Sequence, residues 1–196
     1  DHSMSPTGQR QIALFGGSFD PIHLGHTFIA ARAQEALNLD RVIFLPTFRS
    51  PFKLAPDQAP TDPIHRLHMA RIATADLPWA EISSYEVDLG NTSYSWRTAQ
   101  HFHETLGADT RLFWILGADQ WQKLPTWSRP ERLSELLEFI VFCRDGETPA
   151  ASEQFRSHTV NGTFDASSSA IRSAISEGCS TSSMPLHEGV LEYILK

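Results

Sequence analysis

The chain has 196 residues, of which 41% are hydrophobic, and a formal net charge of −7. This length suits one domain with a sizeable core, and no apolar run approaches the roughly 20 residues that a membrane-spanning helix needs. The acidic balance excludes a general nucleic-acid binder, whose binding face is usually basic. A few local cations can still attract an anionic small substrate.

We expect a single domain over residues 4–196, because residues 1–3 precede Met4 and have the character of an expression remnant. The sequence shows no secretory signal pattern. Cys143 and Cys179 fit no metal-ligand spacing. Together with the missing signal pattern, these cysteines favour a reducing, cytoplasmic location.

Apolar runs that predict buried strands alternate with periodic runs that predict helices. We expect strands over residues 12–15, 41–45, 79–89 (one or two strands), 111–116 and 139–143. We expect helices over residues 27–39, 63–76, 94–106, 130–137, 167–177 and 188–195. Residues 46–63 and 144–160 are expected to be loops.

Continuous apolar strands separated by helices indicate a parallel sheet that is covered on both faces. The predicted fold is therefore a Rossmann-like, doubly wound α/β domain. In such sheets the ligand lies beyond the carboxyl ends of the strands.

The most informative segment is GGSFDPIHLGH at residues 16–26, which joins the first strand to the first helix. The start of a helix presents unpaired N–H groups and attracts a phosphate. Gly16 and Gly17 let the backbone approach a ligand closely. His23 and His26 lie three residues apart and can both donate hydrogen bonds to phosphate oxygens.

Two other interpretations of the histidines are weaker. A metal site would need a third ligand, and none stands nearby in the sequence. Ordinary turn residues would explain one histidine more readily than two that are framed by three glycines. Gly25 also removes a side chain that would block the space between the imidazoles.

The segment GGSFDPIHLGH resembles the signature of the nucleotidylyltransferase superfamily, and in its full form that of the bacterial nicotinate-mononucleotide adenylyltransferases. The His-x-Gly-His part also resembles class I aminoacyl-tRNA synthetases, which are usually longer and carry a lysine motif that this sequence lacks. The resemblance implies that Ser18 and Phe19, with the glycines and histidines, contact ATP.

The sequence SSSAIR at residues 167–172 is similar to the second phosphate motif of the superfamily, which usually reads Ile-Ser-Ser-Thr-x-Ile-Arg. Ala166 replaces its isoleucine, and Ser169 replaces its threonine but keeps the hydroxyl. Serines at a helix start supply hydroxyl and backbone donors, and Arg172 supplies a permanent cation with a forked donor geometry. We expect Ser168, Ser169 and Arg172 to bind ATP; the alternative is a capped helix with a solvated arginine.

Gly117 and Asp119 follow a buried strand, where a carboxylate can accept hydrogen bonds from ribose hydroxyls. The resemblance implies that they contact the adenosine part of ATP. It also implies that Trp127 stacks on a pyridine ring, which suits a flat aromatic face, although core packing is the alternative. Ser128 stands where relatives often carry an aromatic residue, and its N–H group remains available.

Ser93, Tyr94 and Ser95 resemble the Ser-Tyr-Thr turn of the same family and precede a predicted helix. Their N–H groups could hold the carboxylate of the pyridine; a plain N-cap is the alternative. In the loop over residues 46–63, relatives often carry a histidine where this chain has Phe52. The resemblance therefore carries a phosphate-binding role to Lys53 alone, with Arg49 as a helper.

The function that the resemblance implies is adenylyl transfer from ATP to nicotinate mononucleotide in NAD biosynthesis. His23, His26, Lys53 and Arg172 would be the catalytic residues. Mg²⁺ would be carried mainly by ATP, with no dedicated protein ligands for a metal. One alternative is adenylyl or cytidylyl transfer to another acceptor, such as nicotinamide mononucleotide, phosphopantetheine, or a sugar or lipid phosphate. The other is a nucleotide-binding protein without activity. The sequence indicates neither an acid-over-amide preference nor an oligomeric state.

Overall fold

The computed structural model describes residues 9–49, 62–91, 93–178 and 184–196. The expectations placed on residues 1–3, Phe52, Lys53 and Cys179 therefore lie outside the described residues. No helix in the described part of the chain is long and apolar enough to cross a membrane.

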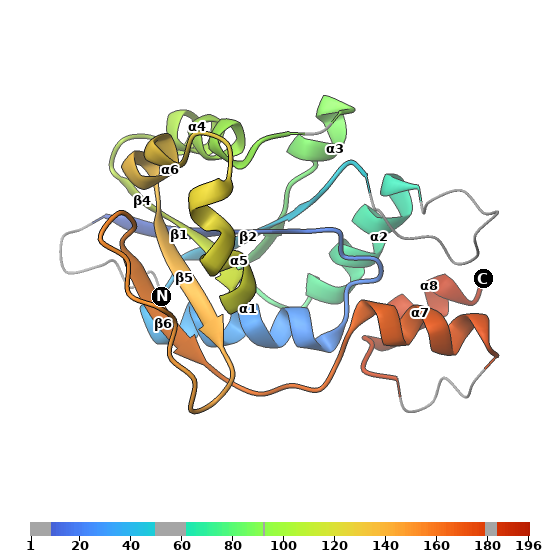
Figure 1. Cartoon of the computed structure of the whole chain (residues 1–196). Helices are drawn as coiled ribbons and strands as arrows, with labels where there is room; N and C mark the ends of the chain where they lie inside the picture. Colours follow the sequence, from blue (N-terminus) through green and yellow to red (C-terminus); the bar gives the residue numbers. More distant parts are fainter. Residues whose placement is uncertain (1–8, 50–61, 92, 179–183) are drawn as a thin grey trace. The chain divides into compact units, whose positions relative to one another are not determined.

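The strands form one six-stranded sheet in the order β3-β2-β1-β4-β5-β6, an open α/β fold of the Rossmann-like type (Figure 1). Strand β4 pairs in parallel with β1 and β5, and β5 pairs in parallel with β6. The predicted fold class is confirmed. The strands are β1 Arg10–Gly17, β2 Arg41–Pro46, β3 Ala80–Ile82, β4 Thr110–Gly117, β5 Glu138–Cys143 and β6 Ser157–Asn161.

The helices begin and end largely where local sequence signals predict. Asp62 caps α2 by accepting a hydrogen bond from the Ile64 N–H, with Pro63 in the first turn. Gly107 ends α4 with a φ of 94°, a backbone conformation that favours glycine. The helices are α1 Leu24–Leu37, α2 Pro63–Thr74, α3 Tyr85–Leu89, α4 Ser95–Leu106, α5 Ala118–Lys123, α6 Pro130–Leu136, α7 Ser168–Ser176 and α8 Glu188–Ile194, with a short 3₁₀ helix at Leu124–Thr126.

Three short elements differ from the prediction. The strand expected over residues 79–89 is wrong beyond β3, because α3 occupies its second half and ends at Gly90 in the left-handed conformation. Strand β6 lies in a segment predicted to be a loop, because its sequence is polar and Val160 is its one buried residue. Helix α5 was not predicted, since six residues are too few to show a helical period.

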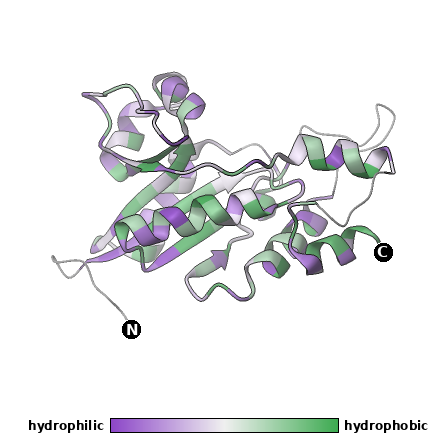
Figure 2. Ribbon diagram, turned by 90° about the horizontal axis from the view of Figure 1, so that it is seen from below, coloured by the Kyte–Doolittle hydropathy of each residue, from purple (hydrophilic) through white to green (hydrophobic). Residues whose placement is uncertain are grey.

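The chain groups into two compact units. The first comprises the residues up to 15 with 29–43 and 93–163; in it α4 packs against α6. The second comprises residues 16–28, 44–92 and 164–196; in it α2 lies beside α8 (Figure 1). The middle residues of strands β1, β2, β4 and β5 are hydrophobic and buried. The helices carry both hydrophobic and hydrophilic residues (Figure 2). The single-domain boundary at residues 4–196 stays a prediction.

A polar network joins the beginnings of four strands in the first unit. Arg111 donates to both carboxylate oxygens of Glu138 at 2.6 and 2.7 Å, and to Gln11 at 2.8 Å. His158 contacts the same carboxylate at 2.9 Å. Burial alone would raise the pKa of Glu138, but the hydrogen bonds from Arg111 and His158 outweigh it and lower this pKa to about 2.

Glu138 is therefore expected to make the fold sensitive to acid. Its pKa lies below the unfolded value near 4.5, so its stabilising effect is complete above pH 4.5 and is lost as the pH falls towards 2. At pH 7, Glu138→Gln should destabilise the protein by about 2 kcal/mol, or roughly 5 °C in Tm. It should also flatten the fall in Tm between pH 5 and pH 3.

Thermal denaturation followed by circular dichroism from pH 3 to pH 7 checks this. Glu135→Gln is the matched control, because Glu135 forms an ion pair with Arg132 but its side chain is 61% exposed. An equal change in both variants would contradict a special role for Glu138.

Candidate active site

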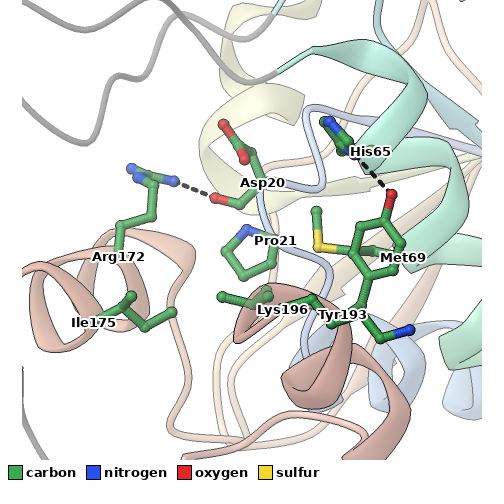
Figure 3. Close-up of a pocket in the computed structure, with 9 residues that line it drawn as sticks. Asp20, Pro21, His65, Met69, Arg172, Ile175, Tyr193 and Lys196 are labelled. Carbon is green, nitrogen blue, oxygen red and sulfur yellow. Dashed lines mark hydrogen bonds between the residues drawn. The ribbon is translucent and has the colours of Figure 1, made fainter.

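The loop between β1 and α1 is held by the second phosphate motif. Arg172 of α7 donates from Nη1 to the Asp20 carbonyl at 2.6 Å (Figure 3). Ser168 donates from Oγ to the Pro21 carbonyl at 2.9 Å. Ser167 caps α7 by accepting from the Ala170 N–H. The two motifs thus meet directly, although about 140 residues separate them in the sequence.

The imidazoles of His23 and His26 are stacked, with ring centroids 3.8 Å apart. The Gly25 N–H donates to Nδ1 of His23 at 3.0 Å, and the His23 N–H donates to Nδ1 of His26 at 3.0 Å. Each Nδ1 is therefore an acceptor, which places the proton of each neutral ring on Nε2. The single N–H donor of each neutral ring is therefore the one on Nε2.

Burial keeps this pair uncharged. It lowers the pKa of His23 to about 4. Burial, followed by the charge on His23, lowers the pKa of His26 to about 3. At neutral pH the site therefore offers two neutral donors rather than two cations.

Gly25 and Phe19 set the positions of the two rings. A Cβ atom on Gly25 would lie 2.7 Å from Cε1 of His23, so only glycine leaves room for this imidazole. The Phe19 ring meets His26 edge-on, with centroids 4.9 Å apart. Phe19 has a φ of 46°, which is uncommon for a residue with a side chain and costs on the order of 1 kcal/mol.

A cavity of about 460 Å³ adjoins the same loop, with Asp20, Pro21 and Arg172 on its wall (Figure 3). His65 and Tyr193 also line it and form a 2.7 Å hydrogen bond. No sequence pattern had singled out His65. The other residues that line this cavity are Met69, Ile175, Ile194 and Lys196.

The residues predicted to bind adenosine belong to the first unit. Asp119 is exposed at the start of α5 and lines a cavity of about 310 Å³ together with Trp121 and Cys143. A Cβ atom on Gly117 would meet nothing within 4 Å among the described residues, so packing gives no reason for a glycine there. Close approach of a ligand would be such a reason.

The residues predicted to bind the mononucleotide also lie in the first unit. Trp127 is half-buried and meets Trp114 edge-on at 6.5 Å, so it is not a core residue. Tyr94 is the N-cap of α4, is 52% exposed, and makes no side-chain capping bond within the described chain. Ser93 and Ser95 are half-buried beside it, and Ser128 is exposed. Their binding roles stay predictions.

Sequence reasoning missed Arg66, a fully buried residue of α2 that bonds to the Ser18 carbonyl. In the sequence it stands in an ordinary helical run, HRLHMAR, and only the fold shows what it contacts. Ser169 is exposed in the first turn of α7.

Residues 14–181 match the cytidylyltransferase-like family, so the chain belongs to this class of nucleotidyltransferases. A probable nicotinate-nucleotide adenylyltransferase of Roseiflexus sp. (strain RS-1) is 40% identical over 176 residues, which cover 85% of this chain and 86% of the relative. One of Hydrogenobaculum sp. (strain Y04AAS1) is 37% identical and covers 94% of this chain and 95% of the relative. Within the class, the chain belongs to the nicotinate-nucleotide adenylyltransferase family.

Solved structures agree on the fold. The Plasmodium falciparum nicotinic acid mononucleotide adenylyltransferase complexed with NaAD superposes with a TM-score of 0.75, at 17% identity and 95% coverage of both chains. At this identity the likeness concerns the architecture alone.

His26→Ala is expected to lower kcat/KM for nucleotidyl transfer by about 10²-fold, because it removes one of the two Nε2–H donors. The Tm should change much less than the rate, since His26 keeps part of its surface exposed. Steady-state pyrophosphate release and thermal denaturation measure the two effects.

His103→Ala is the matched control, because His103 is a half-buried helical histidine of α4 outside the predicted site. Unaltered turnover in His26→Ala, or an equal loss in His103→Ala, would refute the role of His26.

Proposed function

We propose that this protein transfers the adenylyl group of ATP to nicotinate mononucleotide, forming nicotinate adenine dinucleotide and pyrophosphate. The observation that carries the proposal is the stacked pair of neutral imidazoles, each with an Nδ1 that accepts a backbone hydrogen bond and with its proton on Nε2. The names of the similar relatives support the same reaction.

The 5′-phosphate of the mononucleotide is already an anionic nucleophile, so the reaction needs no general base. One of its oxygens bonds to the α-phosphorus of ATP while the bond to the bridging oxygen of the β-phosphate breaks. His23 and His26 donate their Nε2–H bonds to oxygens of the transferring phosphate. Because both rings stay neutral, they stabilise charge that develops in the transition state without exchanging a proton.

Cationic side chains would hold the leaving pyrophosphate. Arg172 lies beside the loop, oriented by its bond to the Asp20 carbonyl, and its forked guanidinium suits phosphate oxygens. We assign Lys53 the same role on the resemblance of its loop. Ser168 and Ser169 would present their donors from the first turn of α7 to the same phosphates.

A Mg²⁺ ion would arrive with ATP. No three His, Cys, Asp or Glu side chains of the described residues form a group that could hold a metal ion. Mg²⁺ prefers phosphate oxygens and retained water. When bound, it neutralises charge on the phosphate chain.

Residues of the first unit would bind the mononucleotide and the ribose. The half-buried ring of Trp127 suits stacking on the pyridine, and the N–H groups at the start of α4 suit its carboxylate. Asp119 would accept hydrogen bonds from the ribose of ATP. We also place the reaction in the cytoplasm, which agrees with the free, buried thiol of Cys143.

Pyrophosphate release with ATP and Mg²⁺ tests the function when the nicotinate and nicotinamide mononucleotides are compared. We expect kcat/KM to be at least about tenfold higher for the acid, because backbone donors pair better with a carboxylate than with a neutral amide. Trp127→Ala should raise KM for the mononucleotide and leave KM for ATP nearly unchanged.

Trp127→Phe is the matched control, since it keeps a flat ring and should keep most of the affinity. An absence of pyrophosphate release with either mononucleotide would contradict the proposed function. An equal loss of affinity for both substrates in Trp127→Ala would contradict the role of Trp127.

A further inference from the structure

We propose that Arg66 is a positioning residue for this reaction, one that fixes the loop carrying the imidazoles to the segment that follows β2. The inference rests on the proposed function. Arg66 lies on α2, and its guanidinium bridges backbone carbonyls of both segments.

The two terminal nitrogens of the Arg66 guanidinium each donate to one backbone carbonyl. Nη1 donates to the Ser18 carbonyl at 2.8 Å, and Nη2 donates to the Phe48 carbonyl at 2.8 Å. A second link runs between the same two segments, because the Thr47 N–H donates to the Gly17 carbonyl at 3.0 Å. The separation of the two segments is thus set by one rigid planar group and one backbone bond.

Burying this guanidinium is costly. Arg66 is 0% exposed, and its Nε has no hydrogen-bond partner within the described chain. Burial lowers the pKa of Arg66, whereas the charges of Asp20 and Asp62 raise it. A well-packed apolar side chain would usually stabilise a core at least as well as a buried charge. Stability alone therefore does not account for an arginine here.

Arg66 affects the imidazoles through Ser18 and Phe19. Ser18, whose carbonyl is held, immediately precedes Phe19. The Phe19 ring packs on His26, and its centroid also lies 5.8 Å from that of Phe44 in β2. Movement of Ser18 would therefore displace the ring against which His26 rests. A displacement of 1 Å in a reacting group can cost about 10²-fold in rate.

The second hydrogen bond of Arg66 holds the segment after β2. Phe48 accepts from Nη2 and stands five residues before Lys53 in the sequence. Arg66 thus fixes the backbone at Phe48, just after β2. Because Arg66 is buried behind these carbonyls, it acts through them and is not itself a catalytic residue.

Arg66→Met and Arg66→Lys test the proposal. Methionine fills a similar volume without donors, and lysine keeps the charge but lacks the planar fork that spans two carbonyls. We expect kcat to fall at least about tenfold in both variants, with KM for ATP changed by less than about threefold. Arg71→Met is the matched control, since Arg71 is an exposed arginine of the same helix, and it should keep wild-type kcat.

A folded Arg66 variant with kcat within about twofold of wild type would overturn the proposal, as would an equal loss in Arg71→Met. Where Arg66→Met does not fold, Arg66→Lys decides by the same criterion. Wild-type protein that releases no pyrophosphate defeats the proposed function instead. In that case the ¹⁵N chemical shifts of the His26 ring test the positioning role of Arg66. A change of these shifts in Arg66→Lys but not in Arg71→Met supports the role. Unchanged shifts in Arg66→Lys overturn it.

Discussion

Three backbone carbonyls of the loop between β1 and α1 accept hydrogen bonds from side chains of α2 and α7, and the rest of the candidate site depends on these bonds. They anchor a loop that contains a residue in a strained conformation and that leads directly into the two imidazoles. Side chains can hold such a backbone only if their own helices are firmly packed. The pairs are Arg66 with Ser18, Arg172 with Asp20, and Ser168 with Pro21.

The neutral state of His23 and His26 follows from the same packing. Their Nδ1 atoms accept from nearby backbone N–H groups, and burial makes a charged ring unfavourable. A cationic pair would attract phosphate more strongly in the ground state, but the two charges would repel each other across the stack. Two neutral donors in fixed positions gain most when charge develops on the transferring phosphate.

Sequence patterns predicted the parts of the structure that local chemistry determines. They found the strand–loop–helix of the first motif, the cap at Asp62 and the start of α7. They failed for α3, where the left-handed Gly90 ends a helix in a segment that had been predicted to be a strand. They also missed Arg66, because its partners are main-chain carbonyls. Every residue has such a carbonyl, so the sequence does not indicate which ones accept a hydrogen bond from a side chain.

The most direct measurement of the central claim is the ¹⁵N NMR spectrum of the histidine rings during an acid titration. We predict that His23 and His26 are protonated on Nε2 alone at pH 7 and that both remain neutral down to pH 5, since burial holds their pKa values near 4 and 3. Addition of ATP should shift the Nε2 signals more than the Nδ1 signals. A ring that is cationic at pH 7, or one that carries its proton on Nδ1, would contradict the account.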